Sequence, residues 1–261
     1  MTGIDKLILA YNSADISDMN KSLLRAILKN LRNISHMSIY DLADDSFSST
    51  ASISRLVKKL GYKNYHYFQK DITDCVNKYE FHNRIIPVET ISEARTIEDV
   101  YFNIADQLLE RMRNELDMSK ISELAQAMHD SKRVILYDFD GGMSNRFLQF
   151  DLFMDGKLCE FYYEEQQIIK HANTLNQDDL VLVFTTKQLY YPDVDAVMDL
   201  VARSGATSCF VADSKHISSA RRAAYQFVLP GVLTAIDFLT MESFLCILTM
   251  KYRSMFCEPN S

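Results

Sequence analysis

The segment from residue 37 to residue 68, MSIYDLADDSFSSTASISRLVKKLGYKNYHYF, contains two short helical patterns with a brief turn between them. Apolar residues with the i, i+3, i+4 spacing of a helix face occur first at Ile39, Leu42 and Ala43 and then at Ile53, Leu56, Val57 and Leu60. The segment therefore predicts two successive amphipathic helices, which is the arrangement of a helix-turn-helix.

The second of these helices has signals at both ends. Ser48 occupies the position of an N-cap, where its hydroxyl would accept a hydrogen bond from an amide of the first turn. Gly61 occupies the position just after the helix, where a left-handed residue is common. We therefore expect the helix to run from Ser49 to Leu60, give or take a residue.

The face opposite the apolar residues combines hydroxyls near the start of this helix with cations farther along. Arg and hydroxyl side chains bond base edges in the major groove, whereas Lys side chains neutralise phosphates. The candidate DNA-contacting residues are Ser48, Ser49, Thr50, Ser54, Arg55, Lys58, Lys59 and Lys63. The alternative for the same residues is an ordinary helical hairpin whose polar face is only solvated.

Charge is distributed unevenly along the chain, and this favours the DNA-binding interpretation. Residues 20–78 contain ten Lys and Arg against five Asp and Glu, a balance of +5, whereas the whole chain has a net charge of −7. Subtracting +5 from −7 leaves −12 for all other residues. A basic module in an otherwise acidic chain is the pattern expected when one domain contacts phosphates.

The same segment resembles the N-terminal domain of the RpiR (MurR/RpiR) family of bacterial transcriptional regulators. In that family a basic run at the end of the recognition helix is followed by Leu, Gly, an aromatic residue, Lys and a second aromatic residue, as in KKLGYKNY here. The resemblance extends upstream to a supporting helix marked by Leu23, Ile27, Leu28 and Leu31. The family usually has Gly or Asn in the turn at Ser46, and a left-handed serine there would cost about 1 kcal/mol relative to glycine.

Length and composition fit a small domain followed by a larger one. The chain has 261 residues, of which 48% are hydrophobic and 24% charged, and no signal peptide or uninterrupted apolar span is apparent. We therefore expect a soluble, cytoplasmic protein. Pro87 and the charged and β-branched residues around it indicate a linker. The expected organisation is a helix-turn-helix domain at 1–78, a linker at 79–96 and a second domain at 97–261.

The second domain begins with helical patterns at residues 100–112 and 121–128 and then changes period. Short apolar runs separated by helix-length segments follow at residues 134–139, 180–184, 208–212 and 226–230. Near-continuous Val, Leu and Ile runs that alternate with helices are typical of parallel strands covered on both faces. An α/β domain of three layers, with a central parallel sheet flanked by helices, is predicted.

The order and spacing of these elements resemble the SIS (sugar isomerase) domain, which in the same family follows the helix-turn-helix and senses a phosphosugar. The ligand motifs depart from the family pattern. The loop YDFDGGMSN retains glycines and a serine at a helix start, although Asp138 and Asp140 would repel an anion. The stretch TTKQLY retains two hydroxyls and a lysine but has Gln188 where the family has glycine.

These motifs, and the end of a third strand, would meet at the carboxyl-end crevice where open α/β sheets bind ligands. The candidate ligand-binding residues are Gly142, Ser144, Thr185, Thr186, Lys187 and Lys215. For the three hydroxyl residues, helix capping and turn formation are the alternative roles.

Two functions fit the sequence. The first is an RpiR-type regulator that binds double-stranded operator DNA as a homodimer or tetramer and controls sugar metabolism genes in response to a phosphosugar or related metabolite. Its SIS-like domain at 97–261 would sense that metabolite or serve only for dimerisation. The second is a phosphosugar isomerase or lyase with an accessory basic domain. We favour the first, because no Glu and His pair can be assigned to the crevice and its phosphate loops are altered. No catalytic residue, metal ion, cofactor or membrane contact is expected.

Overall fold

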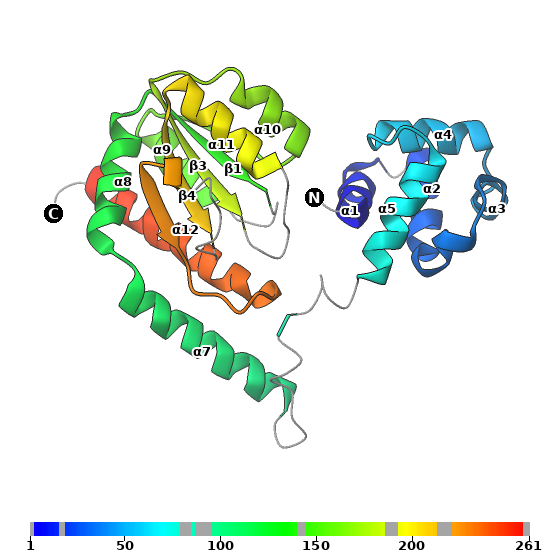
Figure 1. The fold of residues 1–261 in the computed structure, drawn as a ribbon, viewed down its shortest axis with the longest axis horizontal. Coiled ribbons are helices and arrows are strands. Elements are labelled where there is room, and N and C mark those ends of the chain that lie inside the picture. The colour runs from blue at the N-terminus through cyan, green and yellow to red at the C-terminus, as the bar shows by residue number, and fades with distance from the viewer. Residues whose placement is uncertain are drawn as a thin grey trace. The chain divides into compact units, whose positions relative to one another are not determined.

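The computed structural model describes residues 3–15, 19–78, 85–86, 96–139, 145–185, 193–212 and 221–257. The chain divides into two compact units, residues 1–82 and residues 83–261. Each unit has apolar cores of its own. Figure 1 shows their helices and strands. Within the described ranges, no helix combines the length and the apolar character needed to cross a membrane.

The first unit is helical, as the sequence predicts. Its elements are α1 (Gly3–Ser13), α2 (Met19–Lys29), the 3-10 helix η1 (Leu31–His36), α3 (Ile39–Asp45), α4 (Thr50–Lys59) and α5 (Tyr65–Asn77). Their apolar faces meet in one cluster, whose buried members include Leu24, Ile27, Leu42, Ile53 and Phe68. The predicted supporting helix corresponds to α2 and η1, and the two predicted helices of the helix-turn-helix correspond to α3 and α4.

Helix α3 is held at its start by hydrogen bonds that the sequence encodes locally and by others that come from α5. The Ser38 hydroxyl accepts from the Asp41 amide at 3.2 Å, and the Asp41 carboxylate accepts from the Ser38 amide at 2.7 Å, forming a capping box. From α5, the Tyr65 hydroxyl and the Gln69 side-chain amide donate to the Met37 carbonyl at 2.9 and 2.8 Å. Helix α5 thus fixes the backbone from which α3 begins.

The second unit is an α/β domain. Its elements are α7 (Ile97–Glu115), α8 (Met118–Asp130), β1 (Arg133–Asp138), α9 (Arg146–Met154), β2 (Leu158–Tyr162), α10 (Glu165–Ala172), β3 (Asp179–Thr185), α11 (Asp193–Ser204), β4 (Thr207–Ala212), β5 (Tyr225–Val228), the 3-10 helix η4 (Ala235–Asp237), α12 (Phe238–Tyr252) and the π-helix η5 (Arg253–Cys257). The strands form one sheet in the order β2-β1-β3-β4-β5, and every neighbouring pair is parallel. This confirms the predicted fold class.

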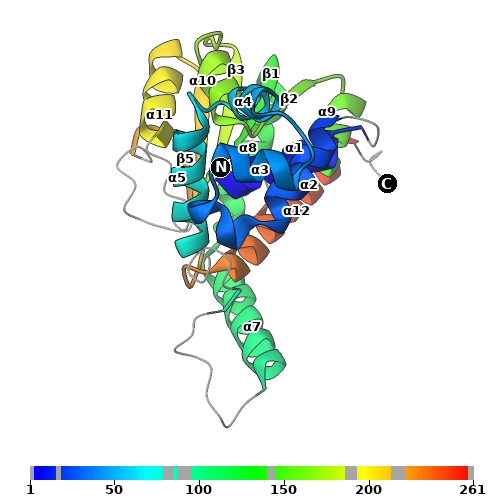
Figure 2. The same cartoon turned by 90° about the vertical axis from the view of Figure 1, so that its right-hand side faces the viewer.

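Helices cover both faces of the sheet (Figures 1 and 2). Along β3, Leu180, Leu182 and Phe184 belong to the cluster that includes α8, α9 and α12. The alternate residues Val181 and Val183 belong to a second cluster with α10 and α11. Because both sets of side chains are buried, the strand has the continuous apolar run from which it was predicted.

Strand β2 is the element that the apolar runs do not predict. It lies at the outer position of the sheet, and in its sequence LCEFY an exposed and a buried residue are followed by three partly buried residues. Its polar side chains are accommodated by partners from neighbouring elements. The Tyr162 hydroxyl donates to Glu160 at 2.7 Å, and Arg133 of β1 donates to the same carboxylate at 3.2 Å.

These contacts belong to a larger network, here called the Arg133 cluster, which consists of Arg133, Tyr137, Glu160, Tyr162, His171 and Asp179. Arg133 makes a two-bond contact with the Asp179 carboxylate at 2.9 and 2.8 Å. The Tyr137 hydroxyl lies 2.8 Å from Nδ1 of His171, whose Nε2 lies 3.0 Å from Glu160 without the alignment of a hydrogen bond. The cluster joins β1, β2 and β3 to α10 under a largely apolar layer.

Electrostatics in the Arg133 cluster favour ionised carboxylates. Burial opposes ionisation of Asp179 and Glu160, but hydrogen bonds and the Arg133 charge outweigh it, so the pKa of each carboxyl group is lowered. Burial of His171 opposes its protonation and lowers its pKa. The cluster therefore contains one cation and two carboxylates near neutral pH, and its stability depends on Arg133.

Replacing Arg133 with Met should lower the free energy of unfolding by about 2–4 kcal/mol near neutral pH, because the buried Asp179 and the partly buried Glu160 lose their cation. In the native protein these carboxylates, with lowered pKa values, add stability above the unfolded pKa of about 4, and this stability is lost as the pH falls. In the variant, protonation removes the unpaired charge. The difference between the two proteins should therefore shrink with falling pH, as urea denaturation at a series of pH values would measure.

Lys132→Met is the matched control. Lys132 also pairs with a carboxylate, Asp178, but its side chain is 77% exposed, so its removal should change stability little. An Arg133→Met penalty that is no larger than this control, or that is unchanged by pH, would contradict the account of the cluster.

Candidate functional site

The turn between α3 and α4 is a Schellman motif, in which residues after a helix bond back to its last carbonyls. The Ser48 amide donates to the Ala43 carbonyl at 2.9 Å, and the Phe47 amide donates to the Asp44 carbonyl at 3.2 Å. Ser46 ends α3 with a φ of −91°, and its hydroxyl donates to the Leu42 carbonyl at 2.6 Å. The turn thereby satisfies carbonyls that α3 leaves unpaired.

Phe47, and not Ser46, is the left-handed residue of this turn. Its φ is +50°, and its side chain is 98% exposed. The condition under which Ser46 would be strained is therefore not met, because the C-cap residue has a negative φ and the next residue makes the reversal. The equivalent turn after α4 has the expected glycine, Gly61, with a φ of +90°.

Ser49 is the N-cap of α4, so the prediction that Ser48 has this role is wrong. The Ser49 hydroxyl accepts from the Ser52 amide at 3.2 Å, and α4 begins at Thr50. Ser48 cannot cap from its position because it completes the preceding Schellman turn, where its hydroxyl lies 2.8 Å from that of Ser46. The reversal after α3 shifts the helix start by one residue.

Burial of one side of α4 determines which residues face solvent. Ile53, Leu56 and Val57 are buried in the first core. Of the predicted DNA-contacting residues, Ser49, Arg55, Lys58, Lys59 and Lys63 are exposed and Ser48, Thr50 and Ser54 are partly exposed. The exposed face thus has hydroxyls near the helix start and cations toward its end, the order required for hydroxyls and an arginine to approach base edges while lysines approach phosphates.

Two residues of this surface were missed by the sequence prediction. Ala51 is exposed at i−4 and i−7 from Arg55 and Lys58, so it lies on the same helix face and offers a methyl group. Phe47 presents an aromatic ring at the turn immediately before α4. Both are apolar, so a prediction based on hydroxyl and basic side chains does not include them, although apolar groups contact thymine methyl groups in the major groove.

The aromatic residues after α4 have a structural role. Tyr62 donates to the Asp71 carboxylate at 2.6 Å and packs edge-on against Phe68, with 5.4 Å between ring centroids. Burial and Asp71 both raise the pKa of Tyr62 well above its usual range, so the phenol stays neutral. These contacts fix α5 against the end of α4 and so set the orientation of the candidate DNA-contacting face.

In the second unit, the predicted ligand crevice falls mostly outside the described residues. Gly142, Ser144, Thr186, Lys187 and Lys215 all lie in ranges that the structure does not describe. Thr185 is the last residue of β3, where it is buried and paired in register with Ala212 at the end of β4. The described ends of β1, β3 and β4 are neighbours in the sheet, so the segments that follow them begin at one edge.

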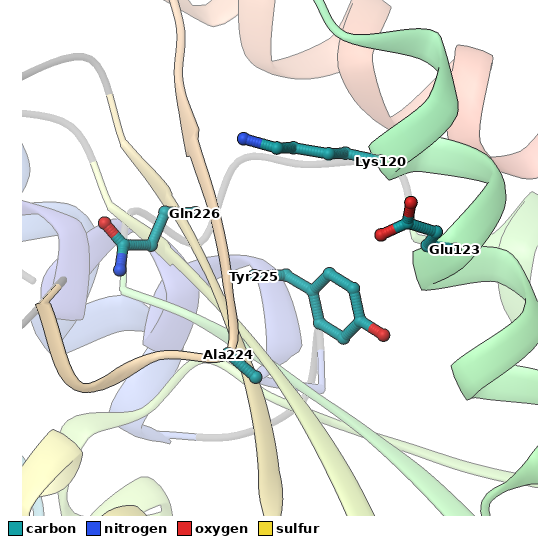
Figure 3. A pocket seen from close by; sticks show the side chains of 5 residues that line it. All are labelled: Lys120, Glu123, Ala224, Tyr225 and Gln226. Carbon is teal, nitrogen blue, oxygen red and sulfur yellow. The ribbon is translucent and has the colours of Figure 1, made fainter.

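A hollow of about 300 Å³ lies elsewhere on the second unit, between α8 and β5. It is lined by Lys120, Glu123, Ala224, Tyr225 and Gln226, and Figure 3 shows the Tyr225 ring extending toward α8. Tyr225 is the first residue of β5, so this hollow lies at the amino end of the strand and not at the carboxyl edge. None of the predicted ligand-binding residues lines it.

A helix-turn-helix with an exposed basic second helix, in one chain with a parallel-sheet domain, defines a class of two-domain DNA-binding proteins. Residues 5–77 match the helix-turn-helix domain of the rpiR family. This part of the chain is therefore a helix-turn-helix domain of the rpiR family.

Relatives of known sequence agree with this assignment. An uncharacterised HTH-type transcriptional regulator of Providencia stuartii is 22% identical over 190 residues, which are 71% of this chain and 66% of that protein. The HTH-type transcriptional regulator RpiR of Escherichia coli K12 is 23% identical over 206 residues, which are 76% of this chain and 67% of that protein. The chain thus spans about two thirds of the length of these curated relatives.

Solved structures support the fold of the second unit. The Vibrio vulnificus NanR protein, solved in complex with ManNAc-6P, is 18% identical with a TM-score of 0.50, over 95% of this chain and 90% of that chain. The sugar isomerase domain of an RpiR transcription factor from Sphaerobacter thermophilus is 18% identical with a TM-score of 0.54, over 62% of this chain and 92% of that chain. The predicted SIS-like fold is confirmed.

Replacing Phe47 with Gly should raise the free energy of unfolding of the first unit by roughly 0.5–1 kcal/mol, because glycine adopts a positive φ without steric cost. The fully exposed ring contributes no packing that the substitution would remove. Urea denaturation of the full chain, followed by circular dichroism, would measure the change.

Ser46→Gly is the informative control for this prediction. It removes the hydrogen bond to the Leu42 carbonyl at a residue whose backbone does not need glycine, so it should lower stability. Stabilisation by Ser46→Gly but not by Phe47→Gly would mean that the left-handed residue has been assigned to the wrong position.

Proposed function

We propose that this chain binds double-stranded operator DNA through α4 and controls sugar metabolism genes in response to a phosphosugar or related metabolite. The main support for DNA binding is the exposed face of α4, which has Arg55 and Lys58 at its centre, while the opposite face of the helix is buried. A protein acting on bacterial operator DNA works in the cytoplasm, which is where we place it.

The charges of the first unit support a specific docking surface. Helix α3 is acidic, and two of its carboxylates have partners: Asp41 bonds the Ser38 amide and Asp45 accepts from Asn30 at 2.8 Å. The cations of α4 and of the turn after it are exposed. Phosphates would therefore be attracted to α4 and the following turn rather than to α3.

We further propose that the chain acts as a homodimer or a higher oligomer. A helix of ten residues contacts only a few base pairs, which gives too little specificity in a genome. Two copies related by a two-fold axis would bind an inverted repeat and multiply the discrimination. The operator is therefore expected to have two similar half-sites of opposite orientation.

For the second unit we propose a ligand site at the carboxyl edge of the sheet, formed by Gly142, Ser144, Thr185, Thr186, Lys187 and Lys215. The support is the sheet topology, since open parallel sheets bind ligands where their strands end, together with the complex of NanR with ManNAc-6P. We assign this unit a sensing role and no catalysis. We favour sensing over the isomerase or lyase alternative because the curated relatives are named as transcriptional regulators.

Arg55→Ala should weaken binding to the cognate DNA roughly 10- to 100-fold, because one contact to a base edge contributes about 1–3 kcal/mol. Lys58→Ala should weaken binding to all sequences alike and reduce the salt slope by about 1, since it removes a phosphate contact. Fluorescence anisotropy with labelled DNA from upstream of the chain's own gene, at several salt concentrations, would measure both effects.

Arg25→Ala removes an equal charge from an exposed position on α2 and serves as the matched control. Only a small, sequence-independent loss is expected for it. Binding that is neither salt-sensitive nor sequence-selective would reject the DNA-binding proposal, and an Arg25→Ala effect equal to that of Arg55→Ala would reject the assignment of the face.

A phosphosugar effector should raise the melting temperature of the second unit, with a stabilisation of about 2.7 kcal/mol at a concentration near 100 times its Kd. A thermal-shift screen would include ManNAc-6P, hexose phosphates and pentose phosphates, each beside the unphosphorylated sugar. Ser144→Ala should abolish the shift, because its hydroxyl is proposed to hold the phosphate.

Ser122→Ala, on α8, should keep the full ligand-induced shift and so controls for loss of a hydroxyl in the same unit. Equal shifts with phosphorylated and unphosphorylated sugars would argue against phosphate recognition. Absence of any shift would reject the phosphosugar part of the proposal and leave the DNA-binding part standing.

A further inference from the structure

Helix α9 has apolar residues on both of its faces, and only one face is covered. Leu148 and Leu152 are buried in the core of the second unit. Phe147, Phe150, Phe153 and Met154 lie on the other side and are between 52% and 71% exposed. A helix that is apolar all round is normally buried, so the exposed side of α9 requires a partner.

Helix α9 leads directly into the strand at the outer edge of the sheet. Asp155, Gly156 and Lys157 connect α9 to β2, whose first residue, Leu158, lies opposite Arg133 and so belongs to the other face of the sheet. In the described part of the chain β2 pairs only with β1, so this strand forms the edge of the sheet beside α9 (Figure 2). We call Phe147, Phe150, Phe153 and Met154 the α9 patch.

The size of the α9 patch matches half of a dimer interface. At about 200 Å² for a large side chain, its exposed fractions amount to roughly 500 Å². Two such patches in contact would bury roughly 1,000 Å², the lower bound for a specific protein–protein interface, before any polar rim is counted. Contact with a second copy of the chain would therefore bring the buried area up to this lower bound.

The spacing within α9 favours pairing with an identical helix. Phe147, Phe150 and Met154 follow the i, i+3, i+7 spacing of a helix–helix seam. In an antiparallel pair with the two-fold axis near Phe150, the two Phe150 rings would meet and each Phe147 would lie against Met154 of the other copy. Such an arrangement is self-complementary, as a two-fold interface requires.

Charge supports the antiparallel orientation. Arg146 is the first residue of α9, where a cation opposes the partial positive charge of its own helix end. It lies over the Phe147 ring, with 5.6 Å between Cζ and the ring centroid, and it is the charged residue of the exposed face. An antiparallel partner would place its negative helix end beside this guanidinium.

We infer that the α9 patch is the surface through which two copies of this chain form a two-fold dimer, with α9 packed against α9 of the partner. The inference deepens the homodimer of the proposed function and rests on it. It assigns to α9 a contact with a second copy of the chain that is separate from the DNA-contacting face.

Analytical ultracentrifugation of the full chain without DNA tests the inference. The native chain should be a dimer, and Phe150→Glu should raise the dimer Kd at least roughly 100-fold by opposing two carboxylates at the axis. Arg146→Glu should raise the dimer Kd roughly 10-fold. Because a carboxylate at the start of α9 stabilises the helix itself, dissociation of this variant could not be attributed to unfolding.

Phe102→Glu is the matched control, because Phe102 is an exposed phenylalanine of α7 in the same unit. It should leave the dimer unchanged. A native chain that is monomeric, a dimeric Phe150→Glu variant, or equal dissociation by Phe102→Glu would each overturn the inference.

Cross-linking gives a second measurement that does not depend on losing a contact. Phe150→Cys should form a disulfide-linked dimer under mild oxidation, because a residue next to a two-fold axis meets its own copy. The native chain, which has five free cysteines including the exposed Cys246, and Phe102→Cys provide the background. If Phe150→Cys formed no more covalent dimer than the native chain and Phe102→Cys, the inference would be overturned. A native chain that does not bind DNA would contradict only the proposed function.

Discussion

Burial of Ile53, Leu56 and Val57 is the constraint on which the first unit depends. A ten-residue helix such as α4 is only marginally stable alone, so its existence and its rotation are both set by these contacts with the helices around it. Once they are buried, Ala51, Arg55 and Lys58 have to face solvent. The DNA-contacting surface is thus a consequence of packing, and its polar residues contribute little to forming the helix that presents them.

Local signals predicted the existence of these helices but not their ends. Ser48, Ser49 and Thr50 are each acceptable N-caps, and the choice among them was made by the Schellman turn after α3, which uses the Ser48 amide. Phe47 could not be identified as left-handed for a related reason. A glycine indicates such a position in a sequence, as Gly61 does. A phenylalanine rarely has a positive φ, so its presence at residue 47 does not predict one.

The sheet was predictable where burial is uniform and not where polar partners replace it. Strand β3 is buried throughout and was predicted from its apolar run. Strand β2 was missed because Glu160 interrupts its apolar run, yet Arg133 and Tyr162 form hydrogen bonds with this carboxylate within the fold. Such contacts between side chains of neighbouring strands depend on the tertiary structure, and a local sequence pattern cannot predict them. The ligand residues remain predictions, since all but Thr185 lie outside the described ranges.

The proposed sensor and the proposed dimer surface are linked through the chain itself. Ser144, assigned to the phosphate, stands two residues before Arg146, the first residue of α9, and the exposed face of the first turn contains Arg146 and Phe147. A ligand bound at this helix start would therefore act on the same short element that meets its copy at the two-fold axis. Under both proposals, a ligand that binds the dimer and the monomer with different affinity would shift the equilibrium between them.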